Sequence, residues 1–197
     1  MAKEVNLANV NNQTKGFSLI EVLVSLVILV IGLIGIFNLH LVSKRSSFES
    51  FQQTQASYYT NDIINRMKLN RTQLLAYNGT YTGQLSLPGT LCDVGVGAAI
   101  VVCSNTETRA WDLYSWEQLF TGSFEQISGR GVGGLDTPTA CIQAQATGQV
   151  IVVMTWRGIR SLSDGAANAT GDSAVFIKSC GSANKRRRVY SINTVII

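Results

Sequence analysis

The chain is poor in the side chains that most enzymes and metal proteins use. It has one histidine, and it contains no HExxH and no G-x-S-x-G motif, so neither a zinc site nor an activated serine is expected. The glycine-rich stretch at 129–134 lacks the lysine and the Ser/Thr of a phosphate-binding loop, and we interpret it as a flexible loop. Turn residues surround four aspartates, for which capping is sufficient explanation: Asp112, Asp136, Asp164 and Asp172. The sequence therefore predicts no enzyme, no cofactor and no metal.

Charge and proline are also scarce. Sixteen basic and 12 acidic residues give a formal net charge of +4, which does not by itself demand a nucleic-acid partner. Between Phe17 and Phe37 the one charged residue is Glu21. The first of only two prolines is Pro88, so nothing before it prevents a long helix.

The apolar segment from Phe17 to Phe37 has the length of a membrane helix. Its 21 residues would rise roughly 31 Å as a helix, enough to cross a hydrocarbon core of about 30 Å. A cleaved secretory signal has a shorter apolar region of about 7 to 15 residues, followed by a small-residue cleavage site. Here the small residue, Gly16, comes before the apolar run, so an uncleaved span is favoured.

Glu21 is costly in such a segment. A carboxylate costs about 2.5 to 3.5 kcal/mol at the centre of a membrane helix, and somewhat less near its end. Either it reaches back to the headgroups, or it awaits a positive partner. The next basic residues, Lys44 and Arg45, lie more than about 30 Å further along a helix. A partner must therefore come from another chain or from a new N-terminus.

The stretch Gly16-Phe17-Ser18-Leu19-Ile20-Glu21, followed by the apolar run, resembles the class III prepilin signal of type IV pilins and type II secretion pseudopilins. A short polar leader with Lys3 and Lys15 precedes it. The resemblance implies that a prepilin peptidase cuts between Gly16 and Phe17 and methylates the Phe17 amine. Removing the 16-residue leader from the 197-residue chain leaves 181 residues. It also implies a partner for Glu21, the methylated Phe17 amine of a neighbouring subunit, which would fix the stagger between subunits.

Within that superfamily the apolar run resembles the PilV minor pilins, the type IV pilus modification proteins. The resemblance rests on Ile31-Gly32-Leu33-Ile34-Gly35 and on Asn38, where major pilins usually have a proline. It implies a structural subunit that helps to initiate or regulate pilus assembly, with a role in twitching motility, adhesion or DNA uptake. The expected partners are other minor and major pilins, the peptidase and the inner-membrane assembly platform. A minor pseudopilin of a type II secretion system is the alternative.

The resemblance also implies a location and a division of the chain. A Gram-negative inner membrane would hold a single span, with the head in the periplasm and later in the pilus. The expected parts are a leader at 1–16, a membrane or filament-core helix at 17–40, an amphipathic helix at 41–77 and a globular head at 78–197.

A second apolar pattern predicts that the helix continues past the membrane. Its apolar members recur at helical spacing and are expected to face the core: Phe48, Phe51, Tyr58, Ile63, Met67 and Leu74. Asn78-Gly79 provides a stop, so one helix from Phe17 to about Tyr77 is expected.

The rest of the chain reads as a mixed head. A short helix is expected at 111–120, with Asp112 as its cap and Leu113, Trp116 and Phe120 on one face. Strand patterns occupy 149–156, 174–177 and 188–196. Three or four antiparallel strands packed on the long helix would form an α+β, pilin-like fold.

Four cysteines follow the apolar segment, at positions 92, 103, 141 and 180. An even number of well-separated cysteines predicts two disulfides in an oxidising compartment, and three pairings are open. We favour Cys92–Cys103 and Cys141–Cys180, because each closes a loop without linking distant parts. The second would resemble the disulfide-bound C-terminal region of pilins.

The one dense basic run is Lys185-Arg186-Arg187-Arg188. If exposed, it would attract phosphate and favour a third interpretation, a tip adhesin or DNA-contacting module. A solvated turn before the last strand is the simpler explanation.

Overall fold

The computed structural model describes residues 16–93 and 101–197. The chain divides into two units, residues 1–44 and 45–197. Within the described part of the first unit lies the beginning of helix α1 (Leu19–Leu69), and its side chains from Gly16 to Lys44 are all exposed. By length and composition α1 qualifies as a candidate membrane span, and its most apolar window is entirely unburied.

The second unit is built on a four-stranded antiparallel sheet, in agreement with the predicted α+β class. Its strand order is β1-β4-β5-β6. The sheet strands are β1 (Gly79–Tyr81), β4 (Thr139–Ala144), β5 (Gln149–Arg157) and β6 (Arg187–Val195). The remaining elements are the 3-10 helix η1 (Arg71–Tyr77), α2 (Asn105–Thr121), the β2–β3 hairpin (Gln126–Ile127 and Arg130–Gly131) and α3 (Ala174–Ser179).

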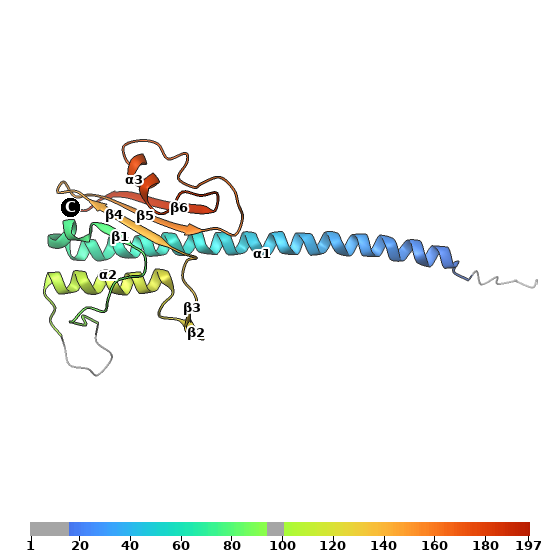
Figure 1. Ribbon diagram of the computed structural model, residues 1–197, viewed down its shortest axis with the longest axis horizontal. Coiled ribbons are helices and arrows are strands. Elements are labelled where there is room, and N and C mark those ends of the chain that lie inside the picture. The colour runs from blue at the N-terminus through green and yellow to red at the C-terminus, as the bar shows by residue number, and fades with distance from the viewer. Residues whose placement is uncertain (1–15, 94–100) are drawn as a thin grey trace, which may run out of the picture. The chain divides into compact units, whose positions relative to one another are not determined.

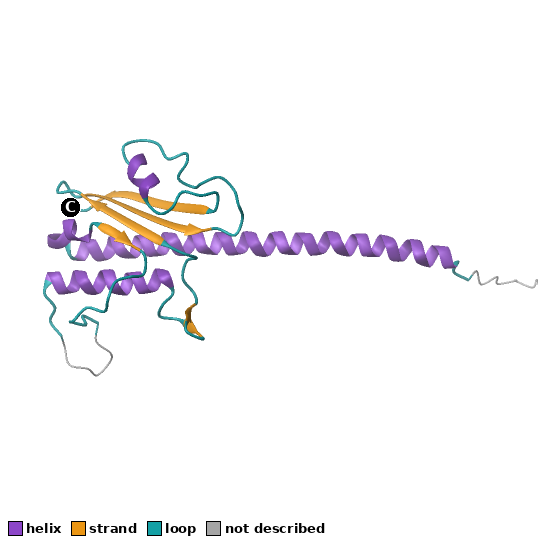
Figure 2. Ribbon diagram, viewed as in Figure 1, coloured by secondary structure: helices purple, strands orange, loops and turns teal. Residues whose placement is uncertain are grey.

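The core of this unit has the later part of α1 at its centre. The sheet lies on one side of that segment and α2 on the other, as Figures 1 and 2 show. The face of α1 that packs into the core is formed by Ala56, Tyr59, Ile63, Ile64 and Met67. Facing it are side chains from α2 and from alternate positions of the sheet, among them Trp116, Phe120, Val150 and Val152. Because this segment of α1 packs against neighbours on two sides, small residues such as Ala56 can also lie on its buried faces.

The buried stripe of α1 differs from the predicted one. Ile63 and Met67 are buried and Leu74 packs against the core, but Phe48, Phe51 and Tyr58 are 44%, 56% and 63% exposed. The prediction that these three aromatic residues face the core is therefore wrong. The true stripe begins with Gln52, Ala56 and Tyr59, because helical spacing from Ile63 toward the N-terminus leads to these positions.

The α-helix also ends earlier than expected. It stops at Leu69, and the chain continues as the 3-10 helix η1 to Tyr77. Between them Asn70 leaves helical geometry, with φ −124° and ψ 51°. Its buried side-chain amide donates to the carbonyl oxygen of Asn105 at 2.7 Å, and this bond ties the end of α1 to the start of α2.

Helix α2 is longer than predicted, and Asp112 is not its cap. Ser104 is the N-cap, and its hydroxyl accepts from the Glu107 backbone N–H while the Glu107 carboxylate accepts from the Ser104 N–H. This capping box, S-x-x-E, is readable in the sequence. The predicted buried face of Leu113, Trp116 and Phe120 is confirmed.

The strand predictions are confirmed at two of three places. β5 and β6 form where expected, but residues 174–177 belong to helix α3 rather than to a strand. In a helix Phe176, Ile177 and Cys180 share one side, where they pack against Val153, and this contact overrides the local β propensity. The sequence prediction missed β4 and β1.

The glycine-rich stretch is more ordered than a flexible loop, since part of it pairs in the β2–β3 hairpin. Gly134 packs directly on the backbone of Thr121 and Gly122, where any Cβ atom would clash. Close backbone packing thus accounts for a glycine here without a phosphate.

Candidate functional site

The N-terminal motif lies at the very start of α1. Gly16, Phe17 and Ser18 precede the helix in non-helical conformation, and the side chain of Phe17 is 85% exposed. The Ser18 carbonyl oxygen accepts from the backbone N–H groups of Glu21 and Val22 at 3.0 and 3.3 Å. The Gly16–Phe17 bond therefore lies in a non-helical, exposed segment just before the helix.

Glu21 lies in the first turn of α1 and is exposed. Within residues 16–93 and 101–197 no basic group pairs with it; Lys3 and Lys15 fall outside these ranges. A carboxylate in the first turn also interacts favourably with the helix dipole, by about 0.3 to 1 kcal/mol. This local effect offsets only part of the cost of a carboxylate in an apolar segment, and it supplies no positive partner.

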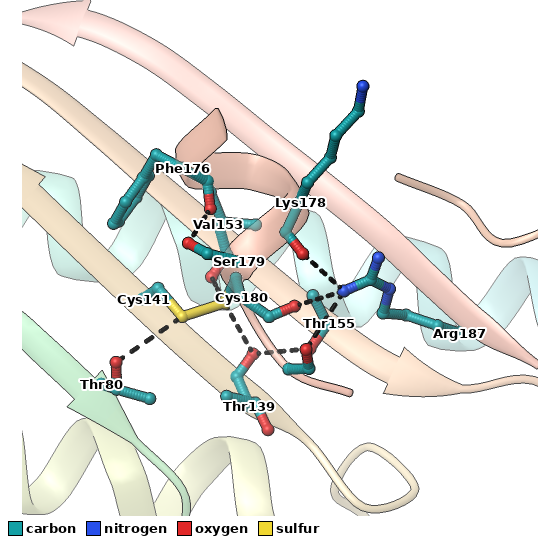
Figure 3. The surroundings of a disulfide bond; sticks show 11 residues. Thr80, Thr139, Cys141, Val153, Thr155, Phe176, Lys178, Ser179, Cys180 and Arg187 are labelled. Carbon is teal, nitrogen blue, oxygen red and sulfur yellow. Dashed lines mark hydrogen bonds between the residues drawn. A yellow bond between two sulfur atoms is a disulfide. The ribbon is translucent and has the colours of Figure 1, made fainter. Parts of the chain in front are cut away.

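The structure joins Cys141 to Cys180 and Cys92 to Cys103, the pairing that loop closure favoured. Figure 3 shows the Cys141–Cys180 bond between β4 and the end of α3, with Val153 of β5 beside it. Both sulfur-bearing residues are buried, at 3% and 1% exposure. The bond therefore pins α3 to the outer face of the sheet, the face opposite α1.

The basic run does not form one exposed patch. Arg187 is 4% exposed, and its guanidinium donates two bonds of 2.8 Å to the carboxylate of Asp164. It also donates to the carbonyl oxygens of Lys178, Cys180 and Gly181, as Figure 3 shows in part. Hydrogen bonding from Arg187 holds the pKa of Asp164 below its ordinary value. Arg187 is thus a structural residue and is withdrawn from the predicted anion contact. Asp164 caps its turn as expected, since its carboxylate accepts from the Ala166 backbone N–H at 3.0 Å, and it is also the ion-pair partner of Arg187.

Arg188 is engaged as well. Its guanidinium lies 3.5 Å from the Glu49 carboxylate on α1 and donates to the Arg160 carbonyl oxygen at 2.8 Å. Arg160 completes the group with a backbone and a side-chain bond to Glu49. Burial alone would raise the pKa of Glu49, but the hydrogen bonds from Arg160 and the charge of Arg188 leave it below the ordinary value. Sequence reasoning missed Glu49 and Arg160, which are 111 positions apart, and no local pattern marks them.

Two other predicted turn aspartates also bind arginines. Asp136 makes a bidentate ion pair with Arg157, and Asp112 accepts from Arg66 and from the hydroxyl of Tyr77. Burial and the Asp112 carboxylate raise the pKa of Tyr77. The Asp112 contacts link α1, η1 and α2, whereas the Asp136 pair joins the segment before β4 to the end of β5. Both aspartates therefore have structural roles. The described residues contain no group of His, Cys, Asp and Glu arranged to hold a metal.

Comparison with known proteins gives one match. The family model described as "Prokaryotic N-terminal methylation motif" matches residues 11–37. Neither the curated proteins nor the solved structures contain a significant match to the chain. The matched segment includes Gly16, Phe17 and Glu21, and it supports a type IV pilin or pseudopilin with a prepilin-type leader. Such a motif indicates processing by a prepilin peptidase, a membrane anchor and a structural rather than enzymatic protein.

Proposed function

We propose that the chain is a minor type IV pilin of the PilV type. In this proposal a prepilin peptidase removes residues 1–16 and methylates Phe17, and residues 17–40 then anchor the protein in the inner membrane. The head lies in the periplasm until the subunit joins a pilus, where it helps to initiate or regulate assembly with other minor and major pilins. The single observation that carries the proposal is the methylation motif at the start of a long helix whose later part is the core of an α+β head.

Glu21 has the central role in this proposal. The Phe17 amine of a neighbouring subunit would pair with it when the subunit leaves the membrane. In a low-dielectric surrounding an unpaired carboxylate is unfavourable, so pairing favours the one axial stagger that brings the two charges together. An exposed Glu21 with no ion pair among the described residues is available for such a contact.

The second candidate is a minor pseudopilin of a type II secretion system, because the same motif and the same Glu21 serve that assembly. The third interpretation, a DNA-contacting tip module, has less support than the bare sequence gave it, since Arg187 and Arg188 are held inside the chain.

The test is purification of the chain from its native host, followed by intact-mass analysis and fractionation. We expect a chain that begins with N-methylated Phe17 and is present in sheared pili. If the chain purified from a host with an active prepilin peptidase still began at Met1, the prepilin assignment would be refuted. If the processed protein were absent from pili but required for export through a secretin, we would assign it to the pseudopilins.

A further inference from the structure

Basic side chains gather at one end of the second unit, around Glu49 of α1. Arg160 binds Glu49 from the loop after β5, and Arg188 reaches it from the start of β6. Arg45 lies one helical turn before Glu49 and is exposed. One carboxylate is therefore shared by two arginines, with a third basic residue close by on the helix.

Two more basic residues are tied to the same loop by backbone hydrogen bonds. The Gly158 N–H donates to the Arg186 carbonyl oxygen at 2.7 Å, and the Leu162 N–H donates to that of Lys185 at 2.8 Å. Both Lys185 and Arg186 are exposed. We call the exposed members of this group, Arg45, Arg160, Lys185 and Arg186, the basic collar. Because Glu49 is the carboxylate bound within it, the collar keeps a surplus of positive charge.

The collar occupies a defined end of the head. Strand β6 runs beside α1, with Arg188 near Glu49, the Tyr190 hydroxyl bonded to Ser57, and Ile196 lining a hollow beside Leu69 and Asn70. The collar is thus at the end where α1 enters this unit, and the exposed Lys68 and Arg71 mark the other end.

Apolar side chains are interleaved with the collar. Ile159 and Leu162, on either side of Arg160, are 39% and 48% exposed. Exposed apolar side chains beside basic ones are the combination with which interfacial segments bind anionic lipid surfaces. A surface that follows a nucleic-acid backbone also uses arginine and lysine, but it combines them with polar and aromatic side chains rather than with aliphatic ones.

We propose that the basic collar docks the head on anionic phospholipid headgroups of the membrane that holds α1. The proposal rests on the membrane anchor of the proposed function. Glu49 is nine residues after His40, the end of the proposed anchor, and nine helical residues rise about 14 Å. Arg45 is closer still along the helix. By the same rise Arg45, five residues after His40, lies about 8 Å from the end of the anchor, within a Debye length of about 8 Å. Glu49 lies beyond that range along the helix axis, so the other collar residues would feel the leaflet only when the head rests on it, which is the proposed docked state.

This contact would give the head a preferred face toward the membrane before assembly. Extraction of the subunit into a filament would break the lipid contact at the same time as Glu21 finds its partner. The anionic lipids would then favour the stored subunit, and the filament would have to outcompete them.

The experiment uses the full chain in lipid nanodiscs. Hydrogen exchange is measured for the backbone of residues 157–165 and 184–189 in neutral phosphatidylcholine discs and in discs with about one third phosphatidylglycerol. We expect slower exchange of both segments in the anionic discs, and reversal at high salt. Each basic residue near an anionic leaflet changes surface affinity about fivefold, so K185Q/R186Q should lower the docked-to-undocked ratio about 25-fold. The matched control is K68Q/R71Q, which removes the same charge from the opposite end and should leave the protection intact.

Three outcomes would overturn the proposal. Equal exchange in neutral and anionic discs would exclude lipid docking, as would equal losses in the two double variants. Protection by a short DNA duplex on neutral discs, without any effect of phosphatidylglycerol, would make the collar a nucleic-acid site. Failure of the chain to enter neutral discs, seen as lack of co-elution, would instead refute the anchor and with it the proposed function.

Discussion

The indole N–H of Trp116 on α2 donates a hydrogen bond of 2.8 Å to the backbone carbonyl oxygen of Tyr59 on α1. Trp116 is fully buried and makes edge-on contacts with Phe120 and Tyr81. We expect Trp116→Phe to lower the free energy of unfolding by about 2 kcal/mol, since it loses this bond and leaves a cavity. Urea unfolding followed by circular dichroism measures the change. Trp111→Phe, on the same helix but only partly buried, is the control and should cost less than about 1 kcal/mol; equal losses would contradict the assigned role of Trp116.

Glu21→Ala should block assembly and spare insertion. The substitution removes a carboxylate that is costly in lipid, so the chain should enter the membrane at least as well as the wild type. Processing should persist, because the bond that we propose as the cleavage site follows Gly16 and does not involve Glu21. The variant should accumulate in the inner membrane and be depleted from sheared filaments. Glu21→Gln should behave in the same way, since it keeps the shape and loses the charge. The measurement is cell fractionation of the wild type and both variants, with all fractions compared on one blot. If either variant were present in filaments at the wild-type amount, Glu21 would have no role in assembly and would only extend its carboxylate to the lipid headgroups.

The two disulfides should differ in their resistance to reduction. Cys141 and Cys180 are buried under α3, whereas Cys92 and Cys103 are partly exposed. A mild thiol reductant without denaturant should therefore open Cys92–Cys103 first. Alkylation and peptide mass analysis over time would show the order, and simultaneous loss of both bonds would mean that global unfolding precedes reduction.

Removing Cys141–Cys180 by paired alanine substitutions should lower the free energy of unfolding by about 4 kcal/mol on a chain-entropy basis, against about 3 kcal/mol for the shorter loop closed by Cys92–Cys103.

Stability should fall in acid partly through Asp164. Its bonds to Arg187 place the pKa of the folded state below the ordinary value near 3.8. The ion pair therefore contributes fully above that ordinary pKa, and its contribution is lost as the pH falls through the folded-state pKa. Unfolding free energies of wild type and Asp164→Asn should converge toward pH 3 or below and differ most near neutrality. A constant difference across this range would show that Asp164 acts by packing rather than by charge.

Regular patterns in the sequence were sufficient to predict the main helix and two of the strands. The apolar run and the lack of proline predict α1, and β-branched alternation predicts β5 and β6. The prediction failed where partners distant in sequence decide the outcome. Phe48 and Phe51 have the chemistry of core residues, but Gln52 and Ala56 occupy the positions that face the sheet and α2. The pattern of apolar residues in the sequence does not by itself show which side of a helix will pack against other elements.

The candidate functional residues also fall into two groups, those that the sequence alone indicates and those whose roles depend on tertiary contacts. Gly16, Phe17 and Glu21 belong to one continuous motif, so the sequence alone is sufficient to propose them as a site. The basic residues at 185–188 also form a run, but in the folded chain Arg187 points inward to Asp164 and Arg188 pairs with Glu49. Glu117 of α2 is another such case, since it is buried and accepts from the backbone N–H groups of Thr82, Gly83 and Leu85. Tertiary partners of this kind leave no mark in local spacing.

The alignment of β6 with α1 has a mechanical consequence. Contacts at Arg188 and Tyr190 fasten the strand to the helix, and nine residue pairs join β6 to β5 along the same direction. Hydrogen bonds between antiparallel strands lie perpendicular to the strands. A pull along α1 therefore loads these bonds together in shear, instead of opening them one after another from an end. A head built in this way resists tension applied through its own helix better than the same number of bonds arranged to unzip.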